Sequence, residues 1–100
     1  MQPFTYLGRE ISVDGVGVEE DPFIVRGTGF NPALAAELES HILNLCFAGA
    51  PWYLVDSRLK KGSAGEQLAI LKIRYFSPEN DTVQSEVWFD VSEAFGNIIE

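Results

Sequence analysis

The chain has 100 residues, of which 46% are hydrophobic and 12% aromatic; this composition predicts a folded domain and excludes a largely disordered chain. Seven Lys and Arg against 15 Asp and Glu give a net charge of −8, which disfavours nucleic acids and anionic membranes as partners. One cysteine cannot form an internal disulfide, no apolar run approaches the ~18 residues of a membrane span, and the first residues do not resemble a secretory signal. We therefore expect a single domain over residues 1–100 in a soluble, cytoplasmic protein.

The first 26 residues contain candidate strands. A strand is expected from Phe4 to Val13, and Asp14-Gly15 follows it, between the apolar segments ISV and VGV. Asp-Gly is typical of two-residue hairpin turns, because both turn positions need positive φ. We therefore expect an N-terminal hairpin in which Val13 faces Val16. The segment FIVR (residues 23–26) predicts a further short strand.

One long helix is expected after the Gly-Thr-Gly segment. Asn31 is a good N-cap and Pro32 suits the first helical position, while Gly49 and Pro51 end the pattern after about Ala48. Apolar residues at three- and four-residue steps predict the buried stripe of this helix: Leu34, Leu38, Ile42 and Leu45.

The second half predicts a three-stranded antiparallel meander of WYLVDSRLK, QLAILKIRYF and TVQSEVWFDV, joined by the turn-rich segments KGSAGE and SPEND. Pairing Val55 with Ile73 and Leu71 with Val87 places most apolar side chains on one face, against which the helix stripe would pack. The expected inner face consists of Tyr53, Val55, Leu59, Ala69, Leu71, Ile73, Tyr75, Val83, Val87, Phe89 and Val91. The C-terminal EAFGNIIE is expected as a short helical turn or an extended tail.

The same register fixes the outer face of the meander. Lys72 would lie between Asp56 and Glu86, and Trp88 would lie beside Ile70 among polar side chains. Three explanations fit a tryptophan there: burial under the N-terminal strands or the C-terminal tail, a self-association surface, or a surface for another protein or a ligand. The candidate interaction residues are Trp88, Ile70, Trp52, Leu54, Arg58, Arg74 and Phe76.

Residues that could carry chemistry are sparse. Cys46 follows His41 by five helical positions, about 140° around the helix, so the two cannot form a nucleophilic pair without a further group. Cys46 is therefore expected to be a small buried apolar residue. With a single histidine, no His-His metal site exists. Gly27-Thr28-Gly29 precedes a helix and could hold an anion, although it lacks the third glycine of a dinucleotide site.

Two charged groups have simple structural explanations as well as functional ones. The acidic run Glu19-Glu20-Asp21 lacks the alternating ligand spacing of a calcium loop and is typical of a solvated loop. Five of the seven basic residues lie between Arg58 and Arg74, near tryptophans, as in single-stranded nucleic-acid platforms. Acidic neighbours such as Asp56 and Glu86 favour a salt-bridged sheet instead.

The sequence thus predicts an α+β fold: an N-terminal hairpin, a short strand and a three-stranded meander in a mainly antiparallel sheet, packed on one long helix. The expected function is that of a non-enzymatic protein-interaction domain that uses the face around Trp88, as a homodimer or with another protein. The alternative is a small-ligand-binding protein or small enzyme with a pocket between helix and sheet, where Tyr53, Tyr75 and His41 would supply the polar groups. We predict no catalytic residue, metal site or cofactor.

Overall fold

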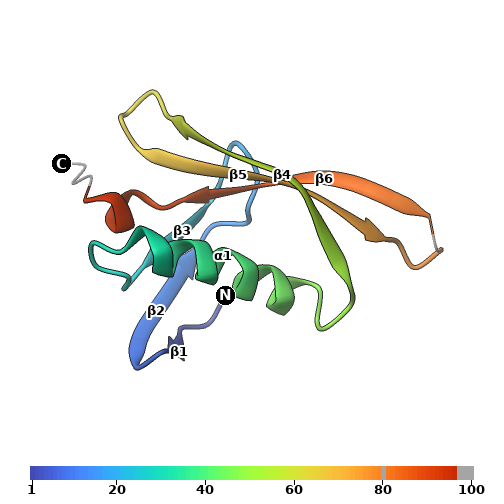
Figure 1. Ribbon diagram of the computed structural model, residues 1–100, viewed down its shortest axis with the longest axis horizontal. Coiled ribbons are helices and arrows are strands. Elements are labelled where there is room, and N and C mark those ends of the chain that lie inside the picture. The colour runs from blue at the N-terminus through green and yellow to red at the C-terminus, as the bar shows by residue number, and fades with distance from the viewer. Residues whose placement is uncertain (80, 97–100) are drawn as a thin grey trace.

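The computed structural model describes residues 1–79 and 81–96, and in it one helix packs on one face of a six-stranded sheet (Figure 1). The elements in chain order are β1 (Phe4–Tyr6), β2 (Arg9–Asp14), β3 (Phe23–Arg26), α1 (Pro32–Cys46), β4 (Trp52–Lys61), β5 (Gln67–Phe76), β6 (Thr82–Asp90) and the 3₁₀-helix η1 (Ser92–Phe95). The α+β class and the long helix are confirmed. Of the C-terminal segment, residues 92–95 form the short helical turn, and residues 97–100 lie outside the described residues.

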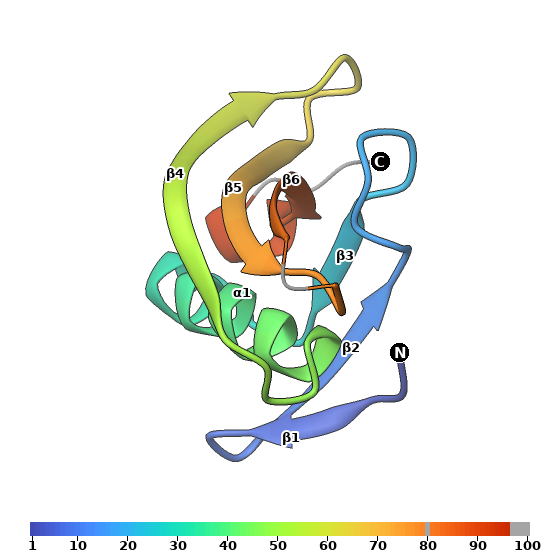
Figure 2. The ribbon, with the colours of Figure 1, turned by 90° about the vertical axis from the view of Figure 1, so that its right-hand side faces the viewer.

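The strand order in the sheet is β1-β2-β3-β6-β5-β4. All neighbouring pairs are antiparallel except β3 and β6, which run parallel at the centre of the sheet. The meander β4-β5-β6 is confirmed. Because β6 joins β3 rather than ending the meander at a free edge, the two outer strands are β1 and β4 (Figure 2).

The predicted N-terminal hairpin at Asp14-Gly15 is wrong. The chain turns earlier, where Leu7 (φ 49°) and Gly8 (φ 77°) both take left-handed conformations, so the single expected strand is split into β1 and β2. Such consecutive positive φ values are those of a tight hairpin turn. Val13 faces Val25 of β3 instead of Val16, and residues 15–22 form a loop closed by bonds from the amides of residues 16–18 to the carbonyl of Asp21.

The helix begins as its sequence predicts. The Asn31 side-chain oxygen accepts a hydrogen bond from the amide of Leu34 at 3.1 Å, and Pro32 stands in the first turn. The helix ends at Cys46, two residues before the expected end. Leu45 was expected in the buried stripe but is 48% exposed, and Leu43 is buried in its place, because the last turn packs with its Leu43 side toward the sheet.

The main core lies between α1 and the inner face of the sheet. Its buried members come from α1, β2, β3, β5, β6 and the segment after β6, and none comes from β4. The buried core residues are Ile11, Val13, Phe23, Val25, Leu34, Ala35, Leu38, Ile42, Leu43, Ala69, Leu71, Ile73, Phe89, Val91 and Ala94. Strand β4 therefore extends the sheet beyond the area that the helix covers.

The predicted register of the meander is confirmed in one part and wrong in another. Leu71 pairs with Val87, and Lys72 lies between Asp56 and Glu86, as expected. A β-bulge at Val55, between Leu54 and Asp56, then shifts the first half of β4 by one residue. As a result Ile73 pairs with Leu54 instead of Val55.

The shift exchanges the two faces for the first residues of β4. Trp52, expected opposite Phe76 on the outer face, pairs with Tyr75 and packs against the main core. Tyr53, expected on the inner face, pairs with Arg74 and is exposed. A one-residue slip has this effect because side chains alternate along a strand.

Within the described part of the chain, no helix is both long and apolar enough to cross a bilayer.

Candidate functional site

Trp88 lies on the face of the sheet opposite α1 and is only 7% exposed. With Leu68 and Ile70 it forms a small second core. The Lys60 ammonium lies over the indole at 5.8 Å from the ring centroid, and the Trp88 amide donates to the carbonyl of Gly17 at 2.8 Å. The loop of residues 15–22 and Lys60 of β4 thus lie against Trp88, where the first of the three explanations expected the N-terminal strands or the C-terminal tail.

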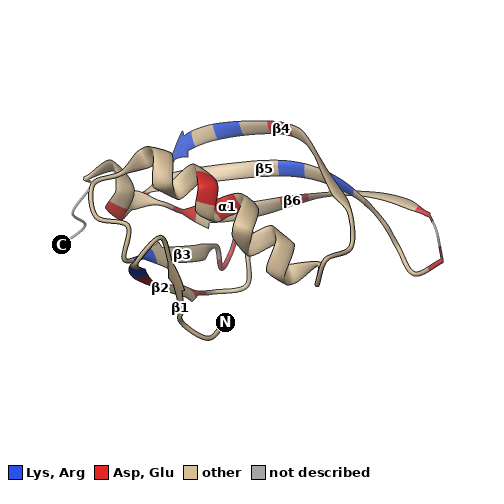
Figure 3. Ribbon diagram, turned by 60° about the horizontal axis from the view of Figure 1, so that its bottom comes forward, with Lys and Arg blue, Asp and Glu red and all other residues tan. Residues whose placement is uncertain are grey.

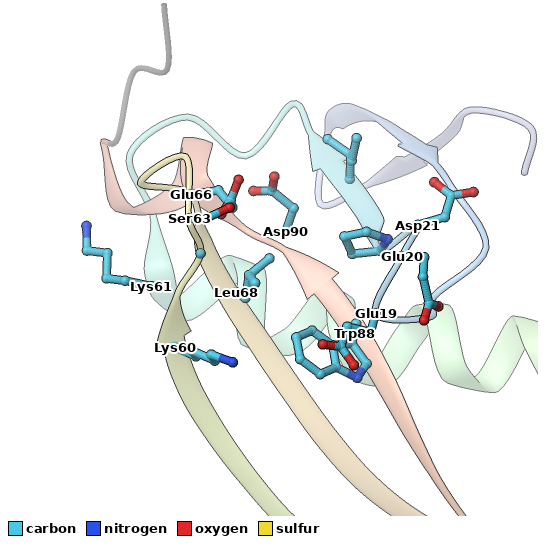
Figure 4. A pocket seen from close by; sticks show the side chains of 13 residues that line it. Glu19, Glu20, Asp21, Lys60, Lys61, Ser63, Glu66, Leu68, Trp88 and Asp90 are labelled. Atoms are coloured by element: carbon cyan, nitrogen blue, oxygen red, sulfur yellow. The ribbon is translucent and has the colours of Figure 1, made fainter.

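A pocket of about 710 Å³ opens beside Trp88 (Figure 4). Carboxylates approach it from the 15–22 loop and from the other side, where Glu66 and Asp90 lie, while two lysines of β4 line it as well. Its lining residues are Glu19, Glu20, Asp21, Pro22, Ile24, Lys60, Lys61, Gly62, Ser63, Glu66, Leu68, Trp88 and Asp90. Five carboxylates against two lysines leave this lining net acidic. Among the described residues no group of three or more His, Cys, Asp or Glu could hold a metal ion.

The seven predicted interaction residues do not share one surface. Trp88 and Ile70 are buried, and Trp52 has turned to the helix face, where its indole N–H donates to the Asn44 side-chain oxygen at 2.7 Å. Four residues remain exposed: Leu54 and Arg58 on β4, and Arg74 and Phe76 on β5. Arg58 is paired with Glu86 at 3.3 Å, and Arg74 donates to Gln84 at 3.2 Å.

Strand β4 is a long edge strand, and within residues 1–79 and 81–96 no further strand pairs with its outer side. Nine of its ten residues are exposed, including Tyr53, Leu54, Val55 and Leu59. The other edge strand, β1, has three residues. A short edge offers little backbone to a second chain, whereas a long edge with apolar side chains is a template for strand pairing. The sequence pattern did not predict this surface, because the mixture of apolar and charged residues in β4 is also typical of a strand with one buried face.

A groove of about 270 Å³ separates β4 from α1. Glu39 of α1 lies in its wall, and the desolvation that this burial causes raises the pKa of the Glu39 carboxyl to about 7. The residues expected to serve a pocket between helix and sheet do not line this groove. The His41 ring makes tilted contacts with Phe4 and Tyr6 on the other side of the helix, and Tyr75 packs against Phe47.

Cys46 is exposed, which corrects the expectation of a buried residue. Partial desolvation nevertheless raises the pKa of its thiol above the ordinary value, which disfavours the thiolate that a nucleophilic cysteine needs.

The Gly-Thr-Gly segment is occupied by the chain's own carboxylate. Glu93 of η1 accepts hydrogen bonds from the amides of Gly27 at 2.8 Å and Gly29 at 2.9 Å, and from the Thr28 hydroxyl at 3.3 Å. The amides that could have held a free anion therefore fix η1 to the start of the helix. No sequence signal connects residues 65 positions apart, so this contact could not be predicted.

Comparisons with protein-family models, with curated proteins and with solved structures found no match to this chain.

Proposed function

We propose that the protein is a non-enzymatic interaction domain that self-associates by antiparallel pairing of β4 with β4 of a second copy. The observation that carries this proposal is that nine of the ten residues of β4 are exposed, although several of them are apolar. Pairing would satisfy the free backbone groups of the edge and remove apolar surface from water. The interface predicted around Trp88 is thereby moved to the neighbouring edge, where Leu54 and Arg58 already lie.

The sequence of β4 is complementary to itself about Ser57. If a two-fold axis passes through Ser57, Asp56 of each copy lies opposite Arg58 of the other. Both side chains are on the outer face, because Asp56 pairs with Lys72 and Arg58 with Ile70 inside one copy. The second copy would therefore extend a row of alternating charges that runs from Glu86 through Lys72 to Asp56.

The apolar side chains of β4 match in the same register. Leu59 faces the helix side of the sheet, opposite Ala69, and Leu54 faces that side too, opposite Ile73. Val55 is the extra residue of the bulge and has no partner of its own, so Leu59 would pair with Leu54 of the other copy. On the outer face Lys60 would meet Tyr53. The two helices would then lie on the same face of a continuous sheet.

The charge pattern of the sheet also favours a second copy of β4, rather than nucleic acid, as the partner. The basic residues of the second half lie on β4 and β5 (Figure 3), where acidic residues of the sheet alternate with them. A phosphate backbone would meet those carboxylates as well as the basic side chains. A second copy of β4 would instead place an acidic side chain opposite a basic one, as with Asp56 and Arg58.

Charge exchange within β4 tests this proposal. Asp56→Arg and Arg58→Asp each place like charges opposite each other twice in the homodimer, so each variant alone should dimerise roughly tenfold more weakly or worse. An equimolar mixture of the two variants restores both opposite-charge pairs and should form a heterodimer. Glu10→Arg on β2 makes the same charge change as Asp56→Arg at the far side of the sheet and serves as the control.

The measurement is molar mass by light scattering on a size-exclusion column. The parent chain and Glu10→Arg should give twice the 11.1 kDa of one chain, and the mixture should recover that mass. A parent chain that stays monomeric, or a dimer that both single variants leave intact, would exclude the β4 interface. Trp88→Glu is unsuitable for this test because it buries a charge beside Ile70 and unfolds the second core.

A further inference from the structure

The groove between α1 and β4 is apolar apart from three residues. Pro32, Ala36 and Glu39 stand four and three positions apart on the helix, so they line the groove from one side of α1. The opposite wall belongs to the sheet and the base to η1: Ser57, Arg58, Leu59, Ala69, Leu71 and Phe95. The groove exists because β4 continues past the area that the helix covers.

Glu39 places a carboxyl group in this groove. Arg58 is the other charged residue of the lining, and its guanidinium is held by Glu86 Oε2 at 3.3 Å. Among the described residues Glu39 belongs to no ion pair. Its raised pKa has the same cause, since desolvation without a nearby cation disfavours the carboxylate. A carboxylate in an apolar groove would be stabilised by a ligand that combines a cationic group with an apolar chain.

We propose that the groove binds a small molecule with a primary ammonium group on an unbranched alkyl chain, with Glu39 as its counter-ion and Leu59, Leu71 and Phe95 against the chain. A volume of about 270 Å³ lies just below the ~300–1,000 Å³ of sites for drug-sized ligands, so it suits one narrow chain. A bare divalent cation would need six or more oxygen ligands, and this groove offers one carboxylate. The inference goes beyond the proposed function and does not rest on it, because one copy forms the whole groove.

Titration with three ligands of equal chain length tests the proposal. Hexylammonium, 1-hexanol and hexanoate share the alkyl chain and differ in head-group charge. At pH 8 hexylammonium should shift the amide resonances of Ala36, Leu59 and Leu71 in a saturable way, with hexanol at least about tenfold weaker, as for the loss of a charged hydrogen bond. Hexanoate should bind most weakly, because its charge repels Glu39.

Two variants and one control complete the test. Glu39→Gln keeps the shape of the side chain and should lower hexylammonium affinity about tenfold, while Glu37→Gln, on the exposed side of the same helix, should leave it unchanged. Ala36→Leu, which narrows the groove without touching the carboxyl, should weaken all three ligands. Lowering the pH from 8 to 5.5 should weaken binding to the parent chain but not to Glu39→Gln.

The proposal is overturned if hexanol binds as tightly as hexylammonium, since the groove would then be an apolar site without charge recognition. It is equally overturned if Glu39→Gln binds hexylammonium as the parent does, if hexanoate binds best, or if none of the three produces a saturable shift. The amides of Ala36 and Leu71 lie outside β4, so their shifts are distinct from the outcomes of the dimer experiment.

Discussion

The ammonium of Lys60 lies 5.8 Å from the centroid of the Trp88 ring, although β5 separates their strands. Lys60 pairs with Leu68 and Trp88 pairs with Ile70, so the lysine reaches diagonally over the second core. A long lysine stem covers apolar surface while its charged end stays in water. The edge strand proposed for self-association is thus tied to the one tryptophan that the sequence analysis found out of place.

The first prediction concerns this contact. Lys60→Ala should remove the cover and the cation–π interaction, which lowers the free energy of unfolding by about 0.5–1 kcal/mol. In a Trp52→Phe background, where Trp88 is the single tryptophan, its emission should move to longer wavelength. Lys61→Ala removes the same charge from the neighbouring residue, and it should change neither the free energy of unfolding nor the Trp88 emission. Equal effects of the two variants would show that charge, not cover, is responsible.

The second prediction concerns the loop that covers Trp88 from the other side. Gly17 has φ +88°, and a Cβ there would lie 2.5 Å from Cε2 of the Phe23 ring. Gly49 has φ +87°, with nothing within 4 Å of its Cβ position. Gly49→Ala should therefore cost about 1–2 kcal/mol for backbone conformation alone, and Gly17→Ala about 1–3 kcal/mol more for the steric conflict. Urea unfolding measures both, and equal losses would contradict the packing of Gly17 against Phe23.

Local chemistry made parts of this fold predictable. Asn31 and Pro32 fix the start of α1 through groups within three residues, and their side chains do the same in any fold. The pairing of Lys72 with Asp56 and Glu86 followed from the requirement that one face be apolar. Both inferences depend on neighbours in sequence or on one alternating pattern.

The features that the sequence did not predict depend on local irregularities or on contacts between distant residues. The bulge at Val55 leaves no mark in composition, yet it moves Trp52 to the other face of the sheet. Leu7-Gly8 turned the chain where Asp14-Gly15 was expected to, because a leucine with positive φ is uncommon and does not predict a turn. The parallel contact of β3 with β6 joins segments over 60 residues apart. The groove beside Glu39 is a consequence of these distant contacts, so no local pattern could reveal it.

The third prediction concerns Glu93, which closes the Gly-Thr-Gly segment. Glu93→Ala leaves the amides of Gly27 and Gly29 without their acceptor and should lower the free energy of unfolding by about 2–3 kcal/mol. Glu93→Gln keeps an acceptor oxygen but not the charge, and it should lose about half as much. Chemical denaturation ranks the two variants, and hydrogen exchange at both glycine amides should quicken in the same order. Equal loss in both variants would mean that charge alone matters.

The last prediction concerns stability against pH at Glu39. Burial raises the pKa of this carboxyl to about 7 in the folded protein, against 4.5 for the free group, so between these values the folded state holds a proton that the unfolded state has released. The free energy of unfolding therefore falls as pH rises from about 4.5 to 7, and Glu39→Gln lacks this loss. The variant should match the parent near pH 4 and exceed its stability by about 1–3 kcal/mol at pH 8, as a shift of this size implies.

Urea unfolding of parent, Glu39→Gln and Glu37→Gln at a series of pH values measures this difference. Glu37→Gln removes a carboxyl from the exposed side of α1, so it controls for the change in net charge. Because the parent loses stability by ionising Glu39 in the groove, any cation that pairs with the carboxylate should restore it. Hexylammonium at pH 8 should therefore raise the stability of the parent toward that of Glu39→Gln, and it should stabilise the variant, which binds it more weakly, to a smaller extent. A difference between parent and Glu39→Gln that does not grow with pH would contradict the burial of this carboxyl.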